Sequence, residues 1–84
     1  MRREAGITFL RTRHRLYRRV DRPTRFGYDV WDPDLPEWRP SKYASRSIGL
    51  GGSASFWTIP ADEAAETIVL VGGTPDDLWV GIDR

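Results

Sequence analysis

Hydrophobic and polar positions alternate most regularly in the N-terminal half of this 84-residue chain. Phe26, Tyr28 and Val30 are separated by a glycine and an aspartate, and a period of two is typical of a β-strand. Residues 14–20 precede this segment, and residues 21–24 have the sequence Asp-Arg-Pro-Thr, which favours a turn. We therefore predict a β-hairpin that pairs residues 14–20 with the segment that follows the turn.

The hydrophobic period of the first twenty residues is mixed. Ile7 and Phe9 alternate as they would in a strand. Apolar residues also recur at spacings that fit a loose helical stripe, at Phe9, Leu16, Tyr17 and Val20. The pattern before residue 14 therefore leaves strand and helix open.

Three prolines interrupt residues 31–40, Trp-Asp-Pro-Asp-Leu-Pro-Glu-Trp-Arg-Pro. Proline fixes φ and lacks a backbone donor, so the segment is predicted to be an extended loop and not a helix or a central strand. Trp31 and Trp38 need either a place in the core or a partner, because an indole in water forfeits apolar burial. Our main interpretation is a loop that these two side chains pin over the core, and a ligand platform is the alternative.

The C-terminal half contains shorter patterns. Residues 43–48 are predicted as a short strand, and the glycine-rich residues 49–55 as a flexible segment that leads into residues 56–59. Pro60 then opens residues 61–66, whose first turn carries acidic groups as a helix prefers. We predict one or two helical turns there.

The last two apolar segments are predicted as paired strands. Residues 67–71, Thr-Ile-Val-Leu-Val, are continuous and β-branched and favour a buried strand, although one helix over residues 61–72 is the alternative. A turn at residues 72–77 leads to a return strand at residues 78–82, which would place on one face Leu78, Val80 and Ile82.

These elements indicate a mainly β, β-rich α+β fold: a small antiparallel sheet or partly open barrel of four to six strands with one short helix. Residues 1–84 are expected to form a single small domain, because a chain of this length has room for only one core. A core of this size has limited stability, and a homo-oligomer would add to it. No apolar run approaches the roughly 20 residues that span a bilayer, so we expect no membrane contact.

Cysteine is absent from the chain. This excludes disulfide frameworks, thiolate zinc sites and cysteine nucleophiles. Small secreted domains usually depend on disulfides, so we expect a cytoplasmic protein. The glycines of residues 49–55 do not match a phosphate-binding loop motif either.

Candidate catalytic and metal-binding residues are few. His14 is the only histidine and lies between Arg13 and Arg15, which would repel a metal cation. Carboxylates cluster without the spacing or the glycine of an EF-hand at Asp29, Asp32, Asp34 and Glu37. We predict no metal, no cofactor and no enzymatic activity; a small ribonuclease that uses His14 and Tyr17 is the catalytic alternative.

Charge is segregated along the chain. Residues 1–25 contain nine arginines and two carboxylates, a net charge of +7, whereas residues 26–84 contain four basic and ten acidic residues, a net charge of −6. Either the arginine segment meets a polyanion, or it packs beside acidic segments and is neutralised within the fold or across a dimer. The sequence leaves both explanations open.

Residues 11–19, Arg-Thr-Arg-His-Arg-Leu-Tyr-Arg-Arg, are the most suggestive segment. As one strand they would place Leu16 and Arg18 on one face, and on the other Arg11, Arg13, Arg15, Tyr17 and Arg19. The second face would suit a phosphate backbone, with Tyr17 available to stack on a base. We predict that nucleic acid or another polyanion binds this hairpin through Arg11, Arg13, Arg15, Tyr17, Arg19, Arg22 and Arg25.

Three functions fit these observations. The first is a small non-enzymatic binding module for nucleic acid or an acidic protein surface. The second is a protein-binding regulator, such as an inhibitor or half of a toxin and antitoxin pair, with Trp31 and Trp38 as exposed anchors. The third is a structural protein that assembles through sheet edges. No motif identifies a family, although abundant arginine without cysteine in so short a chain is typical of phage and mobile-element accessory proteins.

Overall fold

The computed structural model describes residues 6–22, 25–49 and 56–82. Its centre is an open, five-stranded antiparallel sheet with the strand order β4-β3-β2-β1-β5. The strands are β1 (Ile7–Arg11), β2 (Leu16–Arg22), β3 (Arg25–Asp32), β4 (Glu37–Pro40) and β5 (Trp57–Ile59). The expected class, a small β-rich fold built on an antiparallel sheet, is confirmed.

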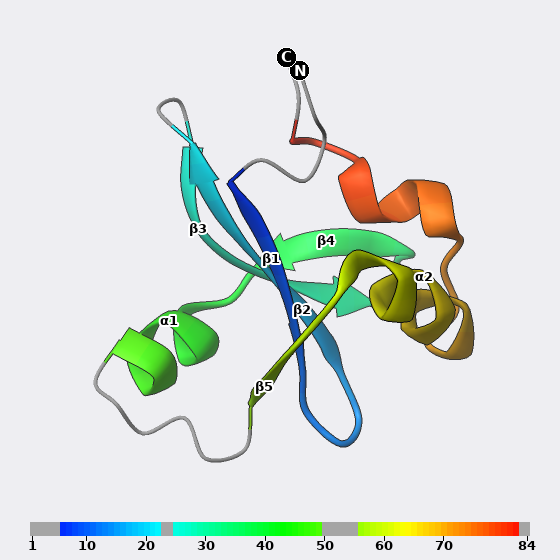
Figure 1. The fold of residues 1–84 in the computed structure, drawn as a ribbon, viewed down its shortest axis with the longest axis horizontal. Coiled ribbons are helices and arrows are strands. Elements are labelled where there is room, and N and C mark those ends of the chain that lie inside the picture. Colours follow the sequence, from blue (N-terminus) through cyan, green and yellow to red (C-terminus); the bar gives the residue numbers. More distant parts are fainter. Residues whose placement is uncertain (1–5, 23–24, 50–55, 83–84) are drawn as a thin grey trace.

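Helices cover both faces of the sheet (Figure 1). Helix α1 (Lys42–Gly49) lies on one face, and α2 (Ala61–Leu70) with the 3-10 helix η1 (Pro75–Trp79) lies on the other. The core on the α1 face contains Leu10, Tyr17, Ala44 and Phe56. The core on the α2 face contains Phe9, Leu16, Trp31, Ile59, Ala64, Ile68 and Leu78. Successive residues of β1 and β2 are therefore buried on opposite faces.

Strands β1 to β4 form a meander in which each strand pairs with the next. The predicted hairpin is β2 with β3, where Tyr17 lies opposite Val30, so this prediction is confirmed. From β4 the chain passes through α1 to the far edge of the sheet. There β5 pairs with β1, and Phe9 lies opposite Ile59.

The proline-rich segment contains more sheet than expected. β3 continues to Asp32, and β4 begins at Glu37 after a turn. The prediction of an extended loop throughout residues 31–40 is therefore wrong. Proline is tolerated in β4 because this is an edge strand, where a missing donor can face away from the ladder. Across the β3–β4 pair, Trp31 lies opposite Trp38.

Helix α1 replaces the short strand predicted for residues 43–48. The Ser41 hydroxyl accepts a hydrogen bond from the backbone N–H of Ala44 at 3.1 Å, which is the contact that an N-cap serine makes. Ala44 is buried against the sheet, whereas Tyr43 is exposed. The capping signal at Ser41 outweighs the strand propensity of the residues after it. The flexible segment expected next lies, from residue 50 to 55, outside the described residues.

Helix α2 contradicts the buried strand predicted for residues 67–71 and confirms the helical alternative. Ala64, Thr67 and Ile68 are buried at helical spacing, whereas Leu70 is 80% exposed. The Thr67 hydroxyl donates to the carbonyl of Glu63 at 2.9 Å. The continuous apolar run conceals a helical period, because only part of it faces the sheet.

The helix η1 replaces the first part of the return strand predicted for residues 78–82. The Asp77 carboxylate accepts hydrogen bonds from the Thr74 backbone N–H at 2.8 Å and from its hydroxyl at 3.0 Å, which caps the helix. Leu78 and Ile82 are buried, but Val80 is exposed. The predicted common face of these three residues is therefore wrong.

Candidate nucleic-acid interface

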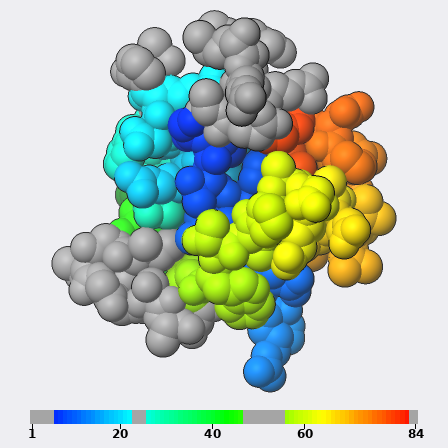
Figure 2. Space-filling view, viewed as in Figure 1, coloured from blue at the N-terminus to red at the C-terminus, as the bar shows by residue number. Residues whose placement is uncertain are grey.

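The turn between β1 and β2, residues 12–15, projects from the molecule as the blue protrusion of Figure 2. Its backbone is closed by a hydrogen bond from the Thr12 N–H to the Arg15 carbonyl at 2.9 Å. The Thr12 hydroxyl accepts from the N–H of Arg15 at 3.1 Å and from that of His14 at 3.4 Å. With the turn held by Thr12, the side chains of Arg13, His14 and Arg15 are exposed.

This turn corrects the prediction of one continuous strand over residues 11–19. The regular alternation of faces stops at Arg11 and starts again at Leu16. Arg13 and Arg15 therefore do not lie on the sheet face that carries Tyr17 and Arg19. Residues 12–15 form the four-residue loop of the β1–β2 hairpin. The hydrophobic pattern of the sequence did not indicate this loop.

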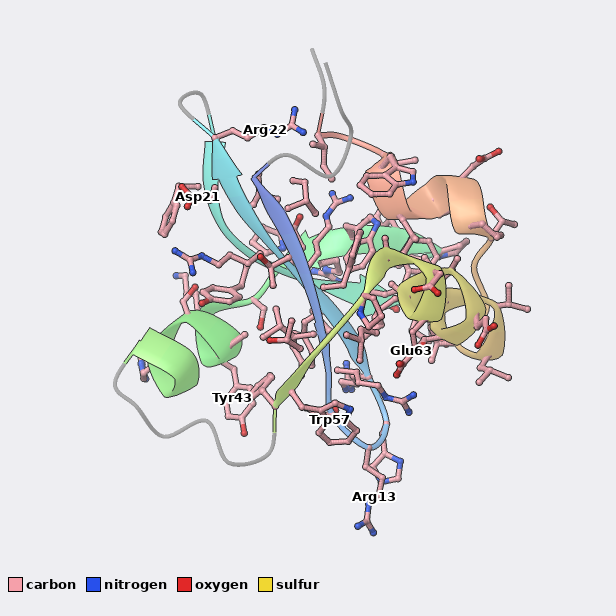
Figure 3. The ribbon with its side chains drawn as sticks, in the orientation of Figure 1. Arg13, Asp21, Arg22, Tyr43, Trp57 and Glu63 are labelled. Carbon is pink, nitrogen blue, oxygen red and sulfur yellow. The ribbon has the colours of Figure 1, made fainter. Side chains whose placement is uncertain are left out.

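An open cleft of about 610 Å³ lies beside the turn. It is lined by Thr12, Arg13, His14, Arg15, Tyr17, Tyr43 and Trp57. None of the described residues that line it is acidic. Figure 3 shows Arg13 at the outer end of the turn, with Trp57 and Tyr43 nearer the body of the molecule. Tyr43 is 64% exposed and Trp57 is 47% exposed.

Trp57 lies in the edge strand β5, opposite Arg11 of β1. The guanidinium carbon of Arg11 is 5.6 Å from the centre of the Trp57 ring, within the range of a cation–π contact. The Arg11 Nε also donates to the Thr12 carbonyl at 3.2 Å. Arg11 thus contacts both the backbone of the turn and the ring of Trp57.

Tyr17 is placed differently from the prediction. Its ring packs edge-on against Phe56 with centroids 4.9 Å apart, and the residue is only 4% exposed. Burial raises the pKa of the Tyr17 hydroxyl above its usual value, an effect that the nearby positive charge of Arg15 partly opposes. The ring is therefore part of the core and has no face to offer to a base.

The remaining arginines of the predicted set lie along β2 or at its far end. Arg19 is half-buried, 3.7 Å from the Asp21 carboxylate and over the ring of Phe26 at 5.4 Å. Arg22 lies opposite Arg25 at the β2–β3 turn, and Figure 3 shows Arg22 at the opposite end of the sheet from Arg13. The structure thus places Arg13 and Arg15 in the lining of one cleft, with Arg11 next to it against Trp57. These three are separate from Arg19, Arg22 and Arg25.

Arg18 was left out of the predicted site, and the structure makes it the most buried arginine described, at 1% exposure. Its Nε donates to the Asp29 carboxylate at 2.9 Å, and its two terminal nitrogens donate to the carbonyls of Leu78 and Val80 at 2.7 Å each. Its guanidinium also lies 4.4 Å from the ring centre of Trp38. The burial of Arg18 could have been predicted from the sequence, because Arg18 lies between the apolar Leu16 and Val20 on one face of the predicted strand.

The acidic cluster of residues 29–37 is partly used inside the fold. Asp29 pairs with Arg18, and Asp32 lies 3.4 Å from Arg39. The backbone N–H of Asp34 donates to Asp32 at 2.9 Å, and this bond lowers the pKa of the Asp32 carboxyl below its usual value. In the part of the chain that the structure describes, no three histidine or acidic side chains are grouped to hold a metal ion.

Trp31 and Trp38 both turn inward. Their rings meet edge-on with centroids 5.4 Å apart. The indole N–H of Trp31 donates to the Val71 carbonyl at 3.0 Å, and that of Trp38 donates to the Asp77 carbonyl at 2.7 Å. Trp31 is buried and Trp38 is half-buried. The interpretation as core anchors therefore fits, whereas their proposed exposure does not.

Comparison with protein families, curated proteins and solved structures finds no similar protein. None of the helices in the described ranges has the length and the apolar character to cross a membrane.

Proposed function

We propose that the β1–β2 turn binds the phosphate backbone of nucleic acid, and that the protein is a binding module and not an enzyme. One observation carries this proposal: Arg13 and Arg15 border a cleft whose described lining has no carboxylate. No described acidic side chain forms an ion pair with either arginine. Their charge is therefore available to a ligand, in contrast to that of Arg18.

The chemistry of these residues suits phosphate. A guanidinium presents a planar fork of donors that matches two phosphate oxygens, and its binding releases counterions from the polyanion. Two to three such contacts give the weak, sequence-independent affinity of non-specific binders, with a Kd of roughly 1 to 100 μM at physiological salt. In the cytoplasm, where we expect the protein on the ground that it lacks cysteine, such ligands are abundant.

The test is a fluorescence-anisotropy titration of labelled single-stranded DNA, RNA and duplex DNA with the purified protein, at low and at physiological salt. We expect affinity to fall steeply as salt rises. The double substitution Arg13→Gln/Arg15→Gln should weaken binding similarly for every sequence. It should also reduce the slope of log K against log salt concentration by about 1 for each arginine that contacts phosphate.

The single substitution Arg13→Gln has a matched control in Arg39→Gln. The control removes the same single charge from β4, the strand at the opposite edge of the sheet from β5, and should change affinity and salt slope little. Absence of binding even at low salt would overturn the proposal and direct the search to an acidic protein partner. Equal losses of affinity for Arg13→Gln and Arg39→Gln would show a general effect of net charge and would contradict a binding site at the turn.

A further inference from the structure

We infer that the cleft beside the turn accepts an unstacked base, so that the ligand is single-stranded nucleic acid with a base lying on Trp57. This inference rests on the proposed binding of phosphate by Arg13 and Arg15, and it adds the class of strand and the residues that select it. The evidence is the pair of exposed aromatic rings, Trp57 and Tyr43, that share the cleft with these arginines.

The environment of Trp57 is suited to stacking. The Arg11 guanidinium lies over the indole at 5.6 Å, while nearly half of the residue remains accessible. A base on the accessible part of the ring would extend a stack of guanidinium, indole and base, in which the positive charge also draws the strand's phosphates. The pairing of β5 with β1 fixes the backbone of Trp57, and the Arg11 guanidinium contacts its ring.

Tyr43 forms the other aromatic border of the cleft. It lies in the first turn of α1, which Ser41 caps, and its ring is tilted against the buried Phe56 with centroids 5.9 Å apart. That contact fixes one side of the tyrosine, and most of the remainder faces solvent. The buried Tyr17 also lines the cleft, from the core on the α1 face.

Exposed rings beside phosphate-binding arginines favour a single strand over a duplex. In a duplex the faces of the bases are already stacked on one another, so an aromatic side chain can reach them only after the duplex is opened. In a single strand every base has an accessible face, and stacking on an aromatic ring is tolerant of sequence. Trp57 and Tyr43, which line the cleft together with the turn, would then set the path of the strand.

The experiment compares three probes of equal length: oligo(dT), the same DNA backbone with abasic sites in place of the bases, and duplex DNA. Anisotropy gives the affinity, and tryptophan fluorescence reports contact with an indole. We expect oligo(dT) to bind about tenfold more tightly than the abasic strand and to quench tryptophan fluorescence. The duplex should bind more weakly than oligo(dT).

Variants assign the effect to the rings. Trp57→Leu should weaken oligo(dT) binding about tenfold, whereas binding of the abasic strand should be unchanged. Trp57→Phe keeps a ring and should recover most of the affinity while removing the quenching signal. Phe26→Leu is the matched control, because Phe26 is also an exposed aromatic residue but lies on β3 near the β2–β3 turn.

The outcomes separate this inference from the function on which it rests. Equal affinity for oligo(dT) and the abasic strand, with a steep salt dependence, would overturn base stacking and leave phosphate binding in place. Tighter binding of duplex than of oligo(dT) would overturn the selection of single strands. Failure of all three probes to bind at low salt would overturn both proposals.

Discussion

Arg15 and Arg18 are three residues apart in one arginine-rich segment, and their surroundings are opposite. Arg18 is buried in the sheet and donates to one carboxylate and two backbone carbonyls. Arg15 is exposed on a turn that its own backbone helps to close. It shares a neighbouring cleft with Asp32 and Asp34, but no ion pair among the described residues joins it to either carboxylate. Neutralisation within the fold, one explanation of the segregated charge, therefore holds for Arg18. Polyanion binding is our proposal for Arg13 and Arg15 only.

The difference comes from the donors and acceptors that each position can reach. At Arg18 the alternation of β2 points the side chain into the core of the α2 face, where the C-terminal segment presents carbonyl groups. A buried guanidinium is tolerated only when its donors are satisfied. At the turn, water satisfies the guanidinium and no fixed partner is needed. One residue type thus stabilises the fold at one site and is available for a ligand at the other.

The largest effect on stability is expected from Arg18→Met. The substitution leaves Asp29 buried without this guanidinium and removes the donor from the carbonyls of Leu78 and Val80. We expect the free energy of unfolding, measured with urea, to fall by about 3 to 5 kcal/mol, a large part of the roughly 4 to 13 kcal/mol typical of this length. The comparison variant Arg13→Met should stay within about 0.5 kcal/mol of the wild type. Equal unfolding midpoints would contradict the assignment of Arg18 to the core.

The second prediction concerns Trp38. Trp38→Ala removes an indole that packs on Trp31 and Arg18 and donates to Asp77, and should cost about 3 kcal/mol of unfolding free energy. The same truncation at the exposed Trp57 should cost less than about 1 kcal/mol. Circular dichroism during thermal unfolding measures both. A Trp38→Ala protein as stable as the wild type would return Trp38 to the candidates for a partner-binding surface.

The third prediction is a loss of stability in alkali that depends on Tyr17. Burial raises the pKa of this hydroxyl in the folded protein above the unfolded value near 10.0. The unfolded chain therefore releases the proton first, so the stabilising contribution is complete below about pH 10 and is lost as pH rises through the folded pKa. Tyr17→Phe should unfold at a temperature that falls less steeply over this range. An unchanged slope would show that the hydroxyl is not buried.

The smallest effect on stability is expected at the turn. Arg13→Gln/Arg15→Gln, which should weaken nucleic-acid binding, should leave the unfolding free energy within about 0.5 kcal/mol of the wild type. Urea unfolding of the same preparation used for the binding titration provides the measurement. A marked destabilisation would mean that these side chains have a structural role, and the contrast with Arg18 would no longer hold.

The sequence predicted the part of the fold where local pattern and tertiary contacts agree. In the β2–β3 hairpin, alternating residues such as Tyr28 and Val30 face one side of the sheet, and a turn sequence joins two strands that are neighbours in space. No distant segment is needed to specify this pairing. The class of fold followed from such local signals.

The C-terminal half was predicted less well because distant contacts determine it. The carbonyls of Leu78 and Val80, which the expected strand would have offered to a neighbouring strand, accept instead from Arg18, 60 and 62 residues away. The β-branched run that begins at Thr67 is part of the helix α2. The buried face of this helix consists of Thr67 and Ile68 together with Ala64, which lies upstream of the run. Composition and propensity of the segment alone do not contain this information.

The candidate site was only partly predictable. The arginines of the turn were identified from their charge, but the turn itself, and with it the separation of Arg13 and Arg15 from Arg19, was not. Tyr43 and Trp57 were not predicted as part of the site, because they come from α1 and β5 and meet the turn only in the folded protein. The spacing of the aromatic residues in the chain gives no indication that they converge.

The path of the chain through the sheet also has a consequence for the order of folding. β1 to β4 pair with their neighbours in sequence, so each pairing closes a short loop at a small entropic cost. Closure of β5 on β1 joins Phe9 to Ile59, and docking of the C-terminal segment on Arg18 joins residues still farther apart. Contacts of high sequence separation have a larger loop-closure entropy cost, which slows their formation. We therefore expect the meander to form the folding nucleus, and the arginine that η1 later covers to be hydrated in the transition state.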